Sequence, residues 1–345
     1  MENDTHILVS VIVPAFNASK TIHRTLDSLI AQTLSPIEII IVDDGSTDNT
    51  LTILLQYQNC YPEKVKVLRG SNSGSFAARS RGINEANGKY VAFCDADDIA
   101  EQNMLEVLYF TAEKTNSDIA VCSYFREKNG VIGEKEMDWG NLQKRITPNA
   151  TWLAMINTSC WNKLIRTKLA KNHIVINKRP AISEDAIFLL SVYPLAKSIS
   201  FTNEALYQYK DSDNSAMKTL SGEDMQVIAS SWIELRSAIE KGSPDYLSVI
   251  DLAAFIHLGV SLPLVAAKTR SGKARKAASY ARKTLDNHFP LYKKTSTLPF
   301  AKVLKEPSRY LMAFIALVAY RLHLFPFAIT IYSKILKHSK HGIRW

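Results

Sequence analysis

The chain has 345 residues, of which 46% are apolar, so it is long enough for about two globular domains with full cores. Its net charge of +9 is unevenly placed, because the residues from Asp224 onward carry 19 Lys and Arg against 7 Asp and Glu. A near-neutral first part and a basic second part indicate two tasks, and basic segments commonly meet anionic membrane or nucleic acid.

The four cysteines are widely spaced and form no CxxC pair, which argues against a disulfide framework or a zinc site built on them. The first residues are polar and show no signal-peptide pattern. We therefore expect reduced thiols and a cytoplasmic setting. The eight histidines show no HxH or HExxH spacing, so a zinc site built on them is not expected.

The first hundred residues alternate apolar strands with amphipathic helices. Almost every position is apolar in the four predicted strands, which are residues 7–13, 37–42, 65–68 and 90–94. Helices are predicted at 20–32, with Ser19 as its N-cap, at 49–58 and at 76–86. This order is typical of a parallel, doubly wound sheet, in which ligands bind beyond the carboxyl ends of the strands.

Polar residues stand at three of these strand ends, and the densest group is Asp95, Asp97 and Asp98. A strand cannot bury three unpaired carboxylates, so the chain must enter a polar crevice here. Oxygen ligands of this kind suit Mg²⁺ or Mn²⁺. Taken alone, the group is equally compatible with a strand-to-helix turn in which one Asp acts as an N-cap.

The first 220 or so residues resemble family 2 glycosyltransferases of the bacterial surface-polysaccharide or teichoic-acid type. The resemblance is carried by VSVIVPAFN, LIAQTL, IIIVDDGSTD, NSGSFAARSRGI, GKYVAFCDADD, WNKLIRTKL, SEDAIF and YQYKDSDNS, in this order. It implies an α/β fold of the GT-A type, Rossmann-like with a mostly parallel sheet. The implied catalytic domain is 1–220, with a nucleotide-binding half (1–100) and an acceptor half (101–220), followed by a basic helical region (221–345).

The resemblance also implies a UDP-sugar donor and a divalent metal, Mn²⁺ or Mg²⁺. Asp97 matches the direct metal ligand of the Asp-X-Asp motif, Asp95 lies near the ribose or metal, and Asp98 is a neighbouring or capping residue. The implied nucleotide-sugar contacts are Pro14, Ala15, Phe16, Asn17, Asp44, Asn72, Arg79, Asp95 and Ala96. Phe16 departs from the family, which often has Tyr there, so stacking is kept and a hydroxyl contact is lost.

The family's Glu-Asp pair corresponds to Glu184 and Asp185, and by resemblance Asp185 is the general base that activates the acceptor hydroxyl. From spacing alone, the two carboxylates are as well explained by the positive end of the helix that they open. A single base opposite the leaving group implies inversion at the anomeric carbon.

Several other residues permit two interpretations. Trp139, Trp152 and Trp161 stack on a sugar ring or belong to the core. Lys163 contacts a diphosphate, contacts an acidic acceptor or covers the surface. Arg81 lies two residues from Arg79 on the predicted helix, hence on a different face, and is interpreted as a solvated charge.

The basic region contains two strongly apolar stretches, Leu252 to Ala267 and Leu311 to Tyr320, and the second is too short to span a bilayer. We expect helices that lie on the cytoplasmic membrane surface, held by apolar faces and by Lys and Arg. The alternative is a helical appendage that packs on the catalytic domain or on a second copy of the chain, as in a homo-oligomer. Nucleic acid is not an expected partner, because no aromatic platform or motif accompanies the charge.

The sequence thus predicts an inverting, metal-dependent transferase that moves a hexosyl or N-acetylhexosaminyl group from a UDP-sugar to a glycan or lipid-linked glycan acceptor. Its expected place is the cytoplasm, peripheral at the inner face of the cell membrane. One alternative is a module that binds nucleotide sugar without turnover. A sugar-phosphate nucleotidyltransferase is disfavoured because VPAFNASK lacks a Gly-rich loop, and a glycoside hydrolase is disfavoured by the nucleotide-site motifs.

Overall fold

The computed structural model describes residues 6–128, 130–136, 153–154, 156–174, 176, 180, 182–211, 222–269, 271–294, 309–325 and 327–329. The chain divides into two compact units. The sheet unit comprises Met1–Pro148, Thr158–Ile174 and Glu184–Asp213, and the helical unit comprises Asn149–Asn157, Val175–Ser183 and Asn214–Trp345. The predicted domain boundary at residue 220 lies outside the described residues.

The sheet unit is built on the four predicted parallel strands. These are β1 (Val9–Ala15), β2 (Ile37–Asp43), β3 (Val65–Arg69) and β4 (Tyr90–Phe93). Their order in the sheet is β3-β2-β1-β4, and β1 pairs in parallel with both β2 and β4. The strand order therefore reverses between β1 and β4, which is the point at which sheets of this kind bind ligands.

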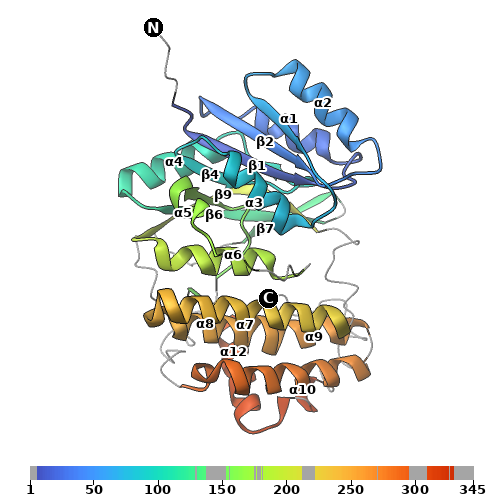
Figure 1. Ribbon diagram of the computed structural model, residues 1–345, viewed down its shortest axis with the longest axis vertical. Coiled ribbons are helices and arrows are strands. Elements are labelled where there is room, and N and C mark those ends of the chain that lie inside the picture. Colours follow the sequence, from blue (N-terminus) through green and yellow to red (C-terminus); the bar gives the residue numbers. More distant parts are fainter. Residues whose placement is uncertain are drawn as a thin grey trace. The chain divides into compact units, whose positions relative to one another are not determined.

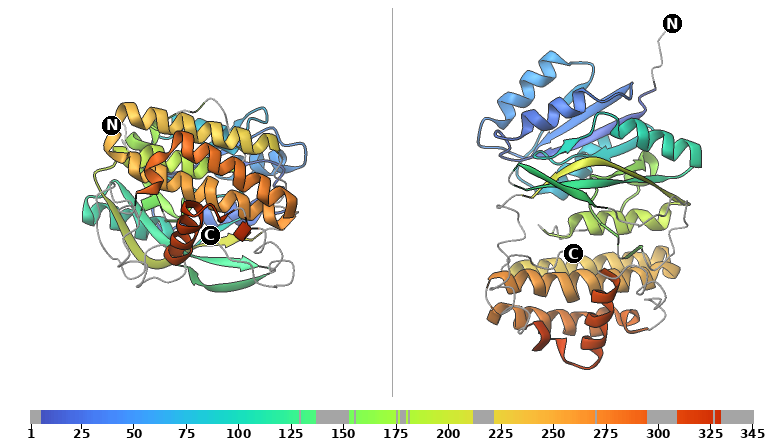
Figure 2. Two further views of the ribbon diagram at one scale, coloured as in Figure 1. Left: turned by 90° about the horizontal axis from the view of Figure 1, so that it is seen from below. Right: turned by 180° about the vertical axis from the view of Figure 1, so that it is seen from behind.

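Helices cover both faces of this sheet (Figures 1 and 2). On one side lie α1 (Ile22–Ile30) and α2 (Thr50–Cys60), and on the other lie α3 (Ser75–Glu85) and α6 (Glu184–Val192). The first face forms the main apolar core, shared by the sheet with α1 (Ile22–Ile30) and α4 (Met104–Thr115). On the second face, a Cβ added to Gly82 of α3 (Ser75–Glu85) would lie 2.5 Å from Ile12 Cγ2. Glycine at this position lets α3 pack closely against the sheet.

Helix α1 begins later than the sequence predicts. Its N-cap position is Thr21 rather than Ser19, and no side-chain hydrogen bond caps the helix. The Thr21 hydroxyl donates instead to the carbonyl oxygens of Ala18 at 3.3 Å and Ala96 at 2.9 Å. Contacts with a loop distant in sequence therefore decide where α1 starts, which a local capping pattern does not reveal.

Beyond β4 the sheet becomes mixed. β8 pairs antiparallel with both β4 and β6, β9 runs parallel to β6, and β5 and β7 pair antiparallel with β9 and β6. The remaining elements of this unit are α2 (Thr50–Cys60), β5 (Ile99–Ala100), β6 (Ile119–Lys128), β7 (Val131–Glu136), β8 (Lys163–Arg166), α5 (Thr167–Lys171), α6 (Glu184–Val192), η2 (Tyr193–Leu195) and β9 (Ile199–Lys210). The predicted α/β fold with a mostly parallel nucleotide-side sheet and a helical C-terminal region is confirmed.

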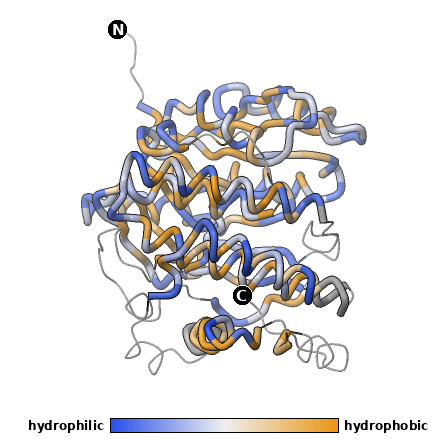
Figure 3. Tube along the Cα trace, turned by 60° about the horizontal axis from the view of Figure 1, so that its bottom comes forward, coloured by the Kyte–Doolittle hydropathy of each residue, from blue (hydrophilic) through white to orange (hydrophobic). Residues whose placement is uncertain are grey.

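The helical unit contains no strand within its described residues. Its elements are α7 (Gly222–Gly242), η4 (Pro244–Tyr246), α8 (Leu247–Ala254), the π-helical η5 (Phe255–Ser261), α9 (Leu262–Thr269), α10 (Ser271–His288), η6 (Pro290–Lys293) and α12 (Arg309–Arg321). α8, η5 and α9 follow one another without a break as one long helix, which runs beside α7, with α10 beyond them (Figure 1). Hydrophobic and hydrophilic residues alternate along these helices (Figure 3), as expected when one face of each is buried.

One helical stretch among the described residues, Pro244–Ala266, is long and apolar enough to cross a membrane. However, 83% of its most apolar window is buried inside the structure. The ring of Phe255 stacks on Tyr292 with 5.2 Å between centroids, and Tyr320 meets its edge at the same distance. This stretch therefore packs within the helical unit, and it contains most of the predicted apolar segment from Leu252 to Ala267.

Candidate active site

The predicted site residues lie at or after the carboxyl ends of β1, β2, β3 and β4, or on the helices next to them. Pro14 and Ala15 end β1, and Asp95 and Asp97 come directly after β4. Arg79 lies on α3, which packs on β1 and β2. The doubly wound topology thus brings together residues that the sequence places far apart.

Arg79 is the centre of a group of three carboxylates, although only 8% of it is exposed. One terminal nitrogen donates to Asp95 Oδ1 at 2.9 Å. The other lies 2.7 Å from Asp185 Oδ1 and 3.8 Å from Glu184 Oε1. The predicted base and the first Asp of the predicted metal motif therefore share one cation.

Local structure explains how these side chains reach one another. Ser75 and Arg79 lie one turn apart on α3 and so share a face, and the Ser75 hydroxyl donates to Glu184 Oε1 at 2.8 Å. Glu184 and Asp185 open α6, where the helix dipole favours negative charge. The backbone N–H of Cys160 donates to Asp185 Oδ2 at 3.0 Å. Asp185 thus has a hydrogen bond at Oδ2 and an ion pair, without a hydrogen bond, at Oδ1.

The three Asp residues after β4 have three different surroundings. Asp98 is 1% exposed and accepts hydrogen bonds from the Tyr207 hydroxyl at 2.8 Å and the Lys210 backbone N–H at 2.7 Å. It therefore anchors the end of β9 to this turn. Asp95 is engaged by Arg79, whereas the carboxylate of Asp97 has no hydrogen bond to another residue and no ion pair within the described part of the chain.

A divalent metal fits this arrangement only together with a ligand that brings its own oxygen atoms. The described residues contain no group of three or more His, Cys, Asp or Glu side chains that could hold a metal ion. Mg²⁺ in phosphate-handling enzymes usually has one or two carboxylates, with phosphate oxygens and water in the other positions. Burial raises the pKa of Asp97, against its own backbone hydrogen bond and the charge of Lys210. A cation at this carboxylate would favour its ionised form.

Three carboxyl groups share one arginine in this group, and burial raises the pKa of two of them. Burial raises the pKa of Glu184 to about 7, and Asp185 adds to this, whereas Arg79 and the hydrogen bond from Ser75 oppose it. Burial also raises the pKa of Asp95, against the charge of Arg79. Burial therefore favours the neutral form of Glu184.

The predicted nucleotide wall after β1 is partly open. Ala15 is buried, but 47% of Phe16 is exposed, so its ring is available for stacking. Asn17 adopts a left-handed conformation with φ of +50°, and its side-chain oxygen accepts the backbone N–H of Thr47 at 2.8 Å. This bond ties the loop after β1 to the loop after β2.

Asp44, predicted to contact the base, is 5% exposed and already holds the loop before α3. Its two oxygens accept the backbone N–H of Ser73 at 2.9 and 3.1 Å and that of Gly74 at 2.7 Å. Asn72 in the same loop is exposed. The structure thus gives Asp44 a loop-ordering role, and its contact with a base stays a prediction.

Two residues with undecided roles belong to the core. Trp161 is 4% exposed and lies flat against Tyr207, with 4.6 Å between ring centroids. Lys163 is fully buried, and its Nζ donates to two oxygen atoms of neighbouring residues at 2.7 and 2.6 Å. Lys163 therefore does not cover the surface. Trp139 and Trp152 lie outside the described residues.

Three residues that the sequence analysis did not single out hold this site together. Ser75 positions Glu184, and its spacing of four residues from Arg79 is a signal that was present in the sequence. Tyr207 lies in a matched segment; its hydroxyl accepts the Asp95 backbone N–H at 3.1 Å and donates to Asp98. Cys160 acts through its backbone, which a side-chain pattern cannot reveal.

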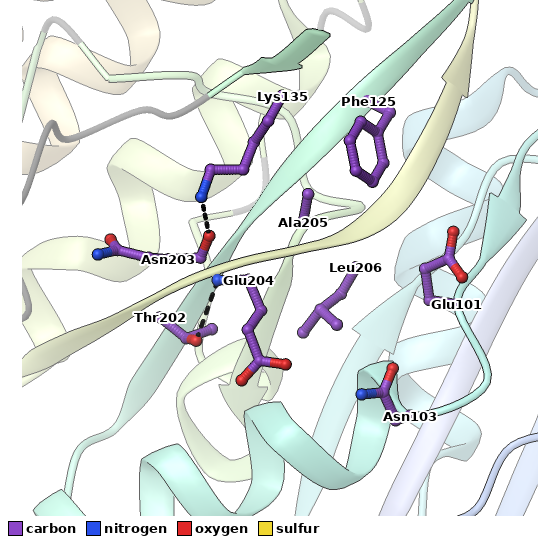
Figure 4. Close-up of a pocket in the computed structure, with 9 residues that line it drawn as sticks. All are labelled: Glu101, Asn103, Phe125, Lys135, Thr202, Asn203, Glu204, Ala205 and Leu206. Atoms are coloured by element: carbon purple, nitrogen blue, oxygen red, sulfur yellow. Dashed lines mark hydrogen bonds between the residues drawn. The ribbon is translucent and has the colours of Figure 1, made fainter. Parts of the chain in front are cut away.

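A hollow of about 660 Å³ lies elsewhere in the sheet unit, and no predicted site residue lines it. Figure 4 shows Phe125 and the carboxylates of Glu101 and Glu204 around it, with Lys135 Nζ donating to the Asn203 carbonyl oxygen at 2.6 Å. Its lining comes mainly from β6, β7, β9 and the segment after β5. It is therefore a feature of the sheet edge rather than of the Arg79 group.

Comparison with known proteins identifies the class. The sequence pattern described as "Glycosyl transferase family 2" matches residues 10–174. The cholesterol galactosyltransferase of Borreliella burgdorferi is 34% identical over 223 residues, which are 60% of this chain and 61% of that protein. Glycosyltransferase GlyG of Streptococcus pneumoniae is 31% identical over 224 residues, 61% of this chain and 73% of that protein. The poly(ribitol-phosphate) beta-N-acetylglucosaminyltransferase TarP of Staphylococcus aureus is 30% identical over 207 residues, 58% and 61% of the two chains.

Solved structures share the fold. S. aureus TarS 1-349 in complex with UDP-GlcNAc aligns with a TM-score of 0.58 at 23% identity, covering 83% of this chain and 91% of that one. A mannosyltransferase from Pyrobaculum calidifontis in complex with GDP-Man and Mn²⁺ aligns with a TM-score of 0.52 at 15% identity, covering 97% and 88%.

The chain belongs to glycosyl transferase family 2 and has the GT-A fold. The match to several curated relatives, the cholesterol galactosyltransferase and TarP among them, spans about three fifths of their length.

Proposed function

We propose that this protein is an inverting, metal-dependent glycosyltransferase that moves a hexosyl or N-acetylhexosaminyl group from a UDP-sugar to a hydroxyl of a surface-glycan precursor. The precursor class is capsule, exopolysaccharide or teichoic acid. Support for the donor comes from the fold shared with TarS, which was solved with UDP-GlcNAc. Support for the acceptor comes from the named activity of the relative TarP.

The observation that carries the proposal is the convergence of Asp95, Glu184 and Asp185 on Arg79, beside the unpartnered Asp97. A buried group with more carboxylates than cations lowers the stability of the fold. Such a group is typical of a site that binds a ligand. Transfer from a sugar diphosphate needs both a base for the acceptor hydroxyl and compensation of charge on the leaving group. The carboxylates around Arg79 supply a base, and the residues of this group are also suited to compensating charge on the leaving group.

Asp185 is the proposed general base. Its carboxylate is fixed by Arg79 on one oxygen and by the Cys160 backbone N–H on the other, so its direction is set before an acceptor binds. A base must lie within hydrogen-bond reach of the proton that it removes, and a fixed carboxylate meets this need without reorganisation. A hydroxyl activated on the side opposite the leaving diphosphate gives inversion at the anomeric carbon.

Asp97, with Asp95 beside it, would hold the proposed Mn²⁺ or Mg²⁺. When bound, such an ion would neutralise negative charge on the leaving diphosphate. Phe16 and Asn17, at the end of β1, would form one wall of the nucleotide site. Arg79 would bring positive charge to the same place.

The proposed setting is the cytoplasm, with peripheral attachment to the inner face of the cell membrane through the basic helical unit. A lipid-linked acceptor would make such attachment useful, because the substrate would then be concentrated at the surface. The charge balance of the residues from Asp224 onward supports attraction to anionic lipid.

The decisive experiment measures UDP release from a panel of UDP-sugars with Mn²⁺, with Mg²⁺ and with EDTA, and includes GDP-mannose as a competing donor class. We expect one UDP-sugar to turn over, EDTA to stop the reaction, and Asp185→Asn and Asp97→Ala to fail. Glu204→Gln, which changes an exposed carboxylate in the sheet-edge hollow, is the matched control and should behave as wild type.

Two outcomes would replace the proposal. Turnover of GDP-mannose alone would change the donor class. Tight binding of a UDP-sugar by calorimetry, without release of UDP even when cell-envelope lipid is added, would support a nucleotide-sugar-binding module instead.

A further inference from the structure

Large apolar side chains are exposed at one place in the helical unit. Ile315, Leu322, Leu324 and Phe327 have exposed fractions of 51, 61, 52 and 68%. They fall within thirteen consecutive positions, with Ile315 in the middle of α12 and the other three after its last residue, Arg321. These four residues are called the apolar tip below. Exposed patches of this kind mark interaction sites, because each side chain would be more stable away from water.

Helix α12 is apolar on two sides. Ala313, Leu317 and Tyr320 are buried, and the Tyr320 ring packs against Phe255 in the core of the helical unit. Ile315 and Leu322 are seven positions apart, so they lie on the same side, and both are exposed, with half-buried residues between them. A surface helix packs on its own protein through one apolar face. A second apolar face is removed from water only when it meets a membrane or another protein.

The backbone of the turn after α12 is held by contacts that leave these apolar side chains exposed to solvent. His323 has φ of +62°, and the Leu324 N–H bonds to the Ala319 carbonyl oxygen at 2.8 Å, which closes the helix end. Phe325 points inward and meets Tyr320 with 4.3 Å between ring centroids. Leu324 and Phe327, on either side of it, remain exposed. The exposure is therefore built into a packed turn.

Basic side chains lie beside the turn that follows α12 and form what is called the basic rim of the apolar tip below. Arg282 of α10 donates to His323 Nε2 at 2.9 Å, and Arg321 donates to the Lys293 carbonyl oxygen. The one acidic side chain in these contacts, Asp286, lies 3.5 Å from Arg282 and 2.7 Å from Lys293 Nζ. Three cations against one carboxylate leave this rim positive.

We propose that the apolar tip inserts into the interface of a lipid membrane while its basic rim binds anionic headgroups. Apolar side chains surrounded by Lys and Arg are the combination that holds a protein on an anionic bilayer surface. A second copy of the chain is a poorer match, because a symmetric contact would bring two positive rims together. The inference deepens the membrane attachment proposed above by assigning it to particular residues.

The test is sedimentation of the purified full-length chain with vesicles of phosphatidylcholine and phosphatidylglycerol, and with phosphatidylcholine alone. We expect binding to the anionic vesicles that weakens as salt is raised. Phe327→Ser should reduce the partition coefficient about tenfold, since one large apolar side chain no longer leaves water. Phe110→Ser is the matched control, because Phe110 is 58% exposed on α4 of the sheet unit; it should bind as wild type.

Arg321→Gln tests the rim and should weaken binding to anionic vesicles several-fold while leaving binding to phosphatidylcholine unchanged. Lys114→Gln, an exposed change on α4, is its control. Donor hydrolysis in solution, without vesicles, is measured for every variant. Equal hydrolysis shows that a variant is folded and that the proposed activity stands whatever the vesicles report.

Two results would overturn the inference. One is equal vesicle binding by wild type, Phe327→Ser and Leu322→Ser. The other is a change of oligomeric state in Phe327→Ser, seen by light scattering, with no vesicle binding by wild type; it would assign the tip to contact between copies.

Discussion

Two arginines, one in each unit, meet carboxylates in opposite ways. In the helical unit, Arg236 Nε donates to Asp251 Oδ1 at 2.8 Å, and Asp251 is fully buried. The other oxygen of Asp251 accepts the Leu291 backbone N–H at 2.8 Å. In the sheet unit, Arg79 is shared among three carboxylates, and its buried Nε has no hydrogen-bond partner within the described residues.

This difference distinguishes the Arg236–Asp251 ion pair, which stabilises the fold, from the group around Arg79, which is a candidate functional site. Asp251 has one cation and a hydrogen bond for each oxygen, so this buried pair satisfies its own requirements. The group around Arg79 has three carboxyl groups for one cation and an unsatisfied buried donor, which a folded protein keeps mainly where a ligand completes the site. Substitutions around Arg79 should therefore change catalysis, and substitutions around Arg236 should change stability.

The largest expected effect is on turnover when the base is removed. Asp185→Asn keeps the shape of the side chain but cannot accept the acceptor's proton, so kcat should fall by about 10³-fold. The KM for the donor should change little, because Asp185 faces the acceptor in the proposed mechanism. Steady-state kinetics with the preferred donor and an acceptor checks this. A KM rise with unchanged kcat would mean that Asp185 binds the donor instead.

The next effect concerns the shared cation. Arg79→Lys keeps one positive charge but loses the planar fork that reaches Asp95 and Asp185 together, so kcat should fall roughly 10- to 100-fold. Arg81→Gln is the control on the same helix, since Arg81 is exposed and donates to the Arg69 carbonyl oxygen at 2.6 Å. It should leave kcat within about twofold. A pure loss of donor affinity in Arg79→Lys would return Arg79 to the nucleotide-binding role that the sequence predicts.

The contrasting substitution is Asp251→Asn in the helical unit. It leaves Arg236 without its buried counter-ion, so the free energy of unfolding should fall by about 2–4 kcal/mol. UDP release by the folded protein should stay near the wild-type rate. Denaturant unfolding measures the change, and Glu240→Gln is the control, because Glu240 is the 57% exposed second partner of Arg236. The control should lose less than about 1 kcal/mol. Loss of UDP release in Asp251→Asn, with an unchanged free energy of unfolding, would contradict the assignment of Asp251 to stability.

The smallest effect is a pH dependence of stability in the sheet unit. Burial raises the pKa of Glu184 from 4.5 to about 7, with Asp185 adding to the shift. A carboxyl with a raised pKa in the folded state favours folding below its ordinary pKa, and this contribution is lost as pH rises through about 7. The unfolding free energy should therefore fall by roughly 1–3 kcal/mol between pH 4.5 and 7.5 through this group. Glu184→Gln should reduce that fall, as measured by denaturation at the two pH values, and an unchanged slope would show that Glu184 does not titrate there.

Much of the sheet unit was predictable because its signals are local. Four apolar runs predicted β1 to β4 within two residues, and the positions of the glycosyl transferase family 2 segments led to Asp97 and to the pair Glu184 and Asp185. The apolar pattern of a strand and the polar residues at its end fall within ten or twenty consecutive residues, so both can be recognised from the sequence alone.

Contacts between distant segments depended on the tertiary structure. The sequence singled out Arg79 as a donor contact, but only the packing of α3 beside α6 brings it between Asp95 and Asp185. Lys163 was unassignable for the same reason, since its burial depends on neighbours that the fold supplies.

The helical unit shows the same division. The sequence by itself determined that the residues after Asp224 form a basic, helix-rich region with apolar stretches. It did not determine which apolar faces are buried, because a core helix and a membrane-facing helix have the same composition. Packing decides between them: Phe255 lies against Tyr292 inside the unit, whereas Leu322 and Phe327 face outward.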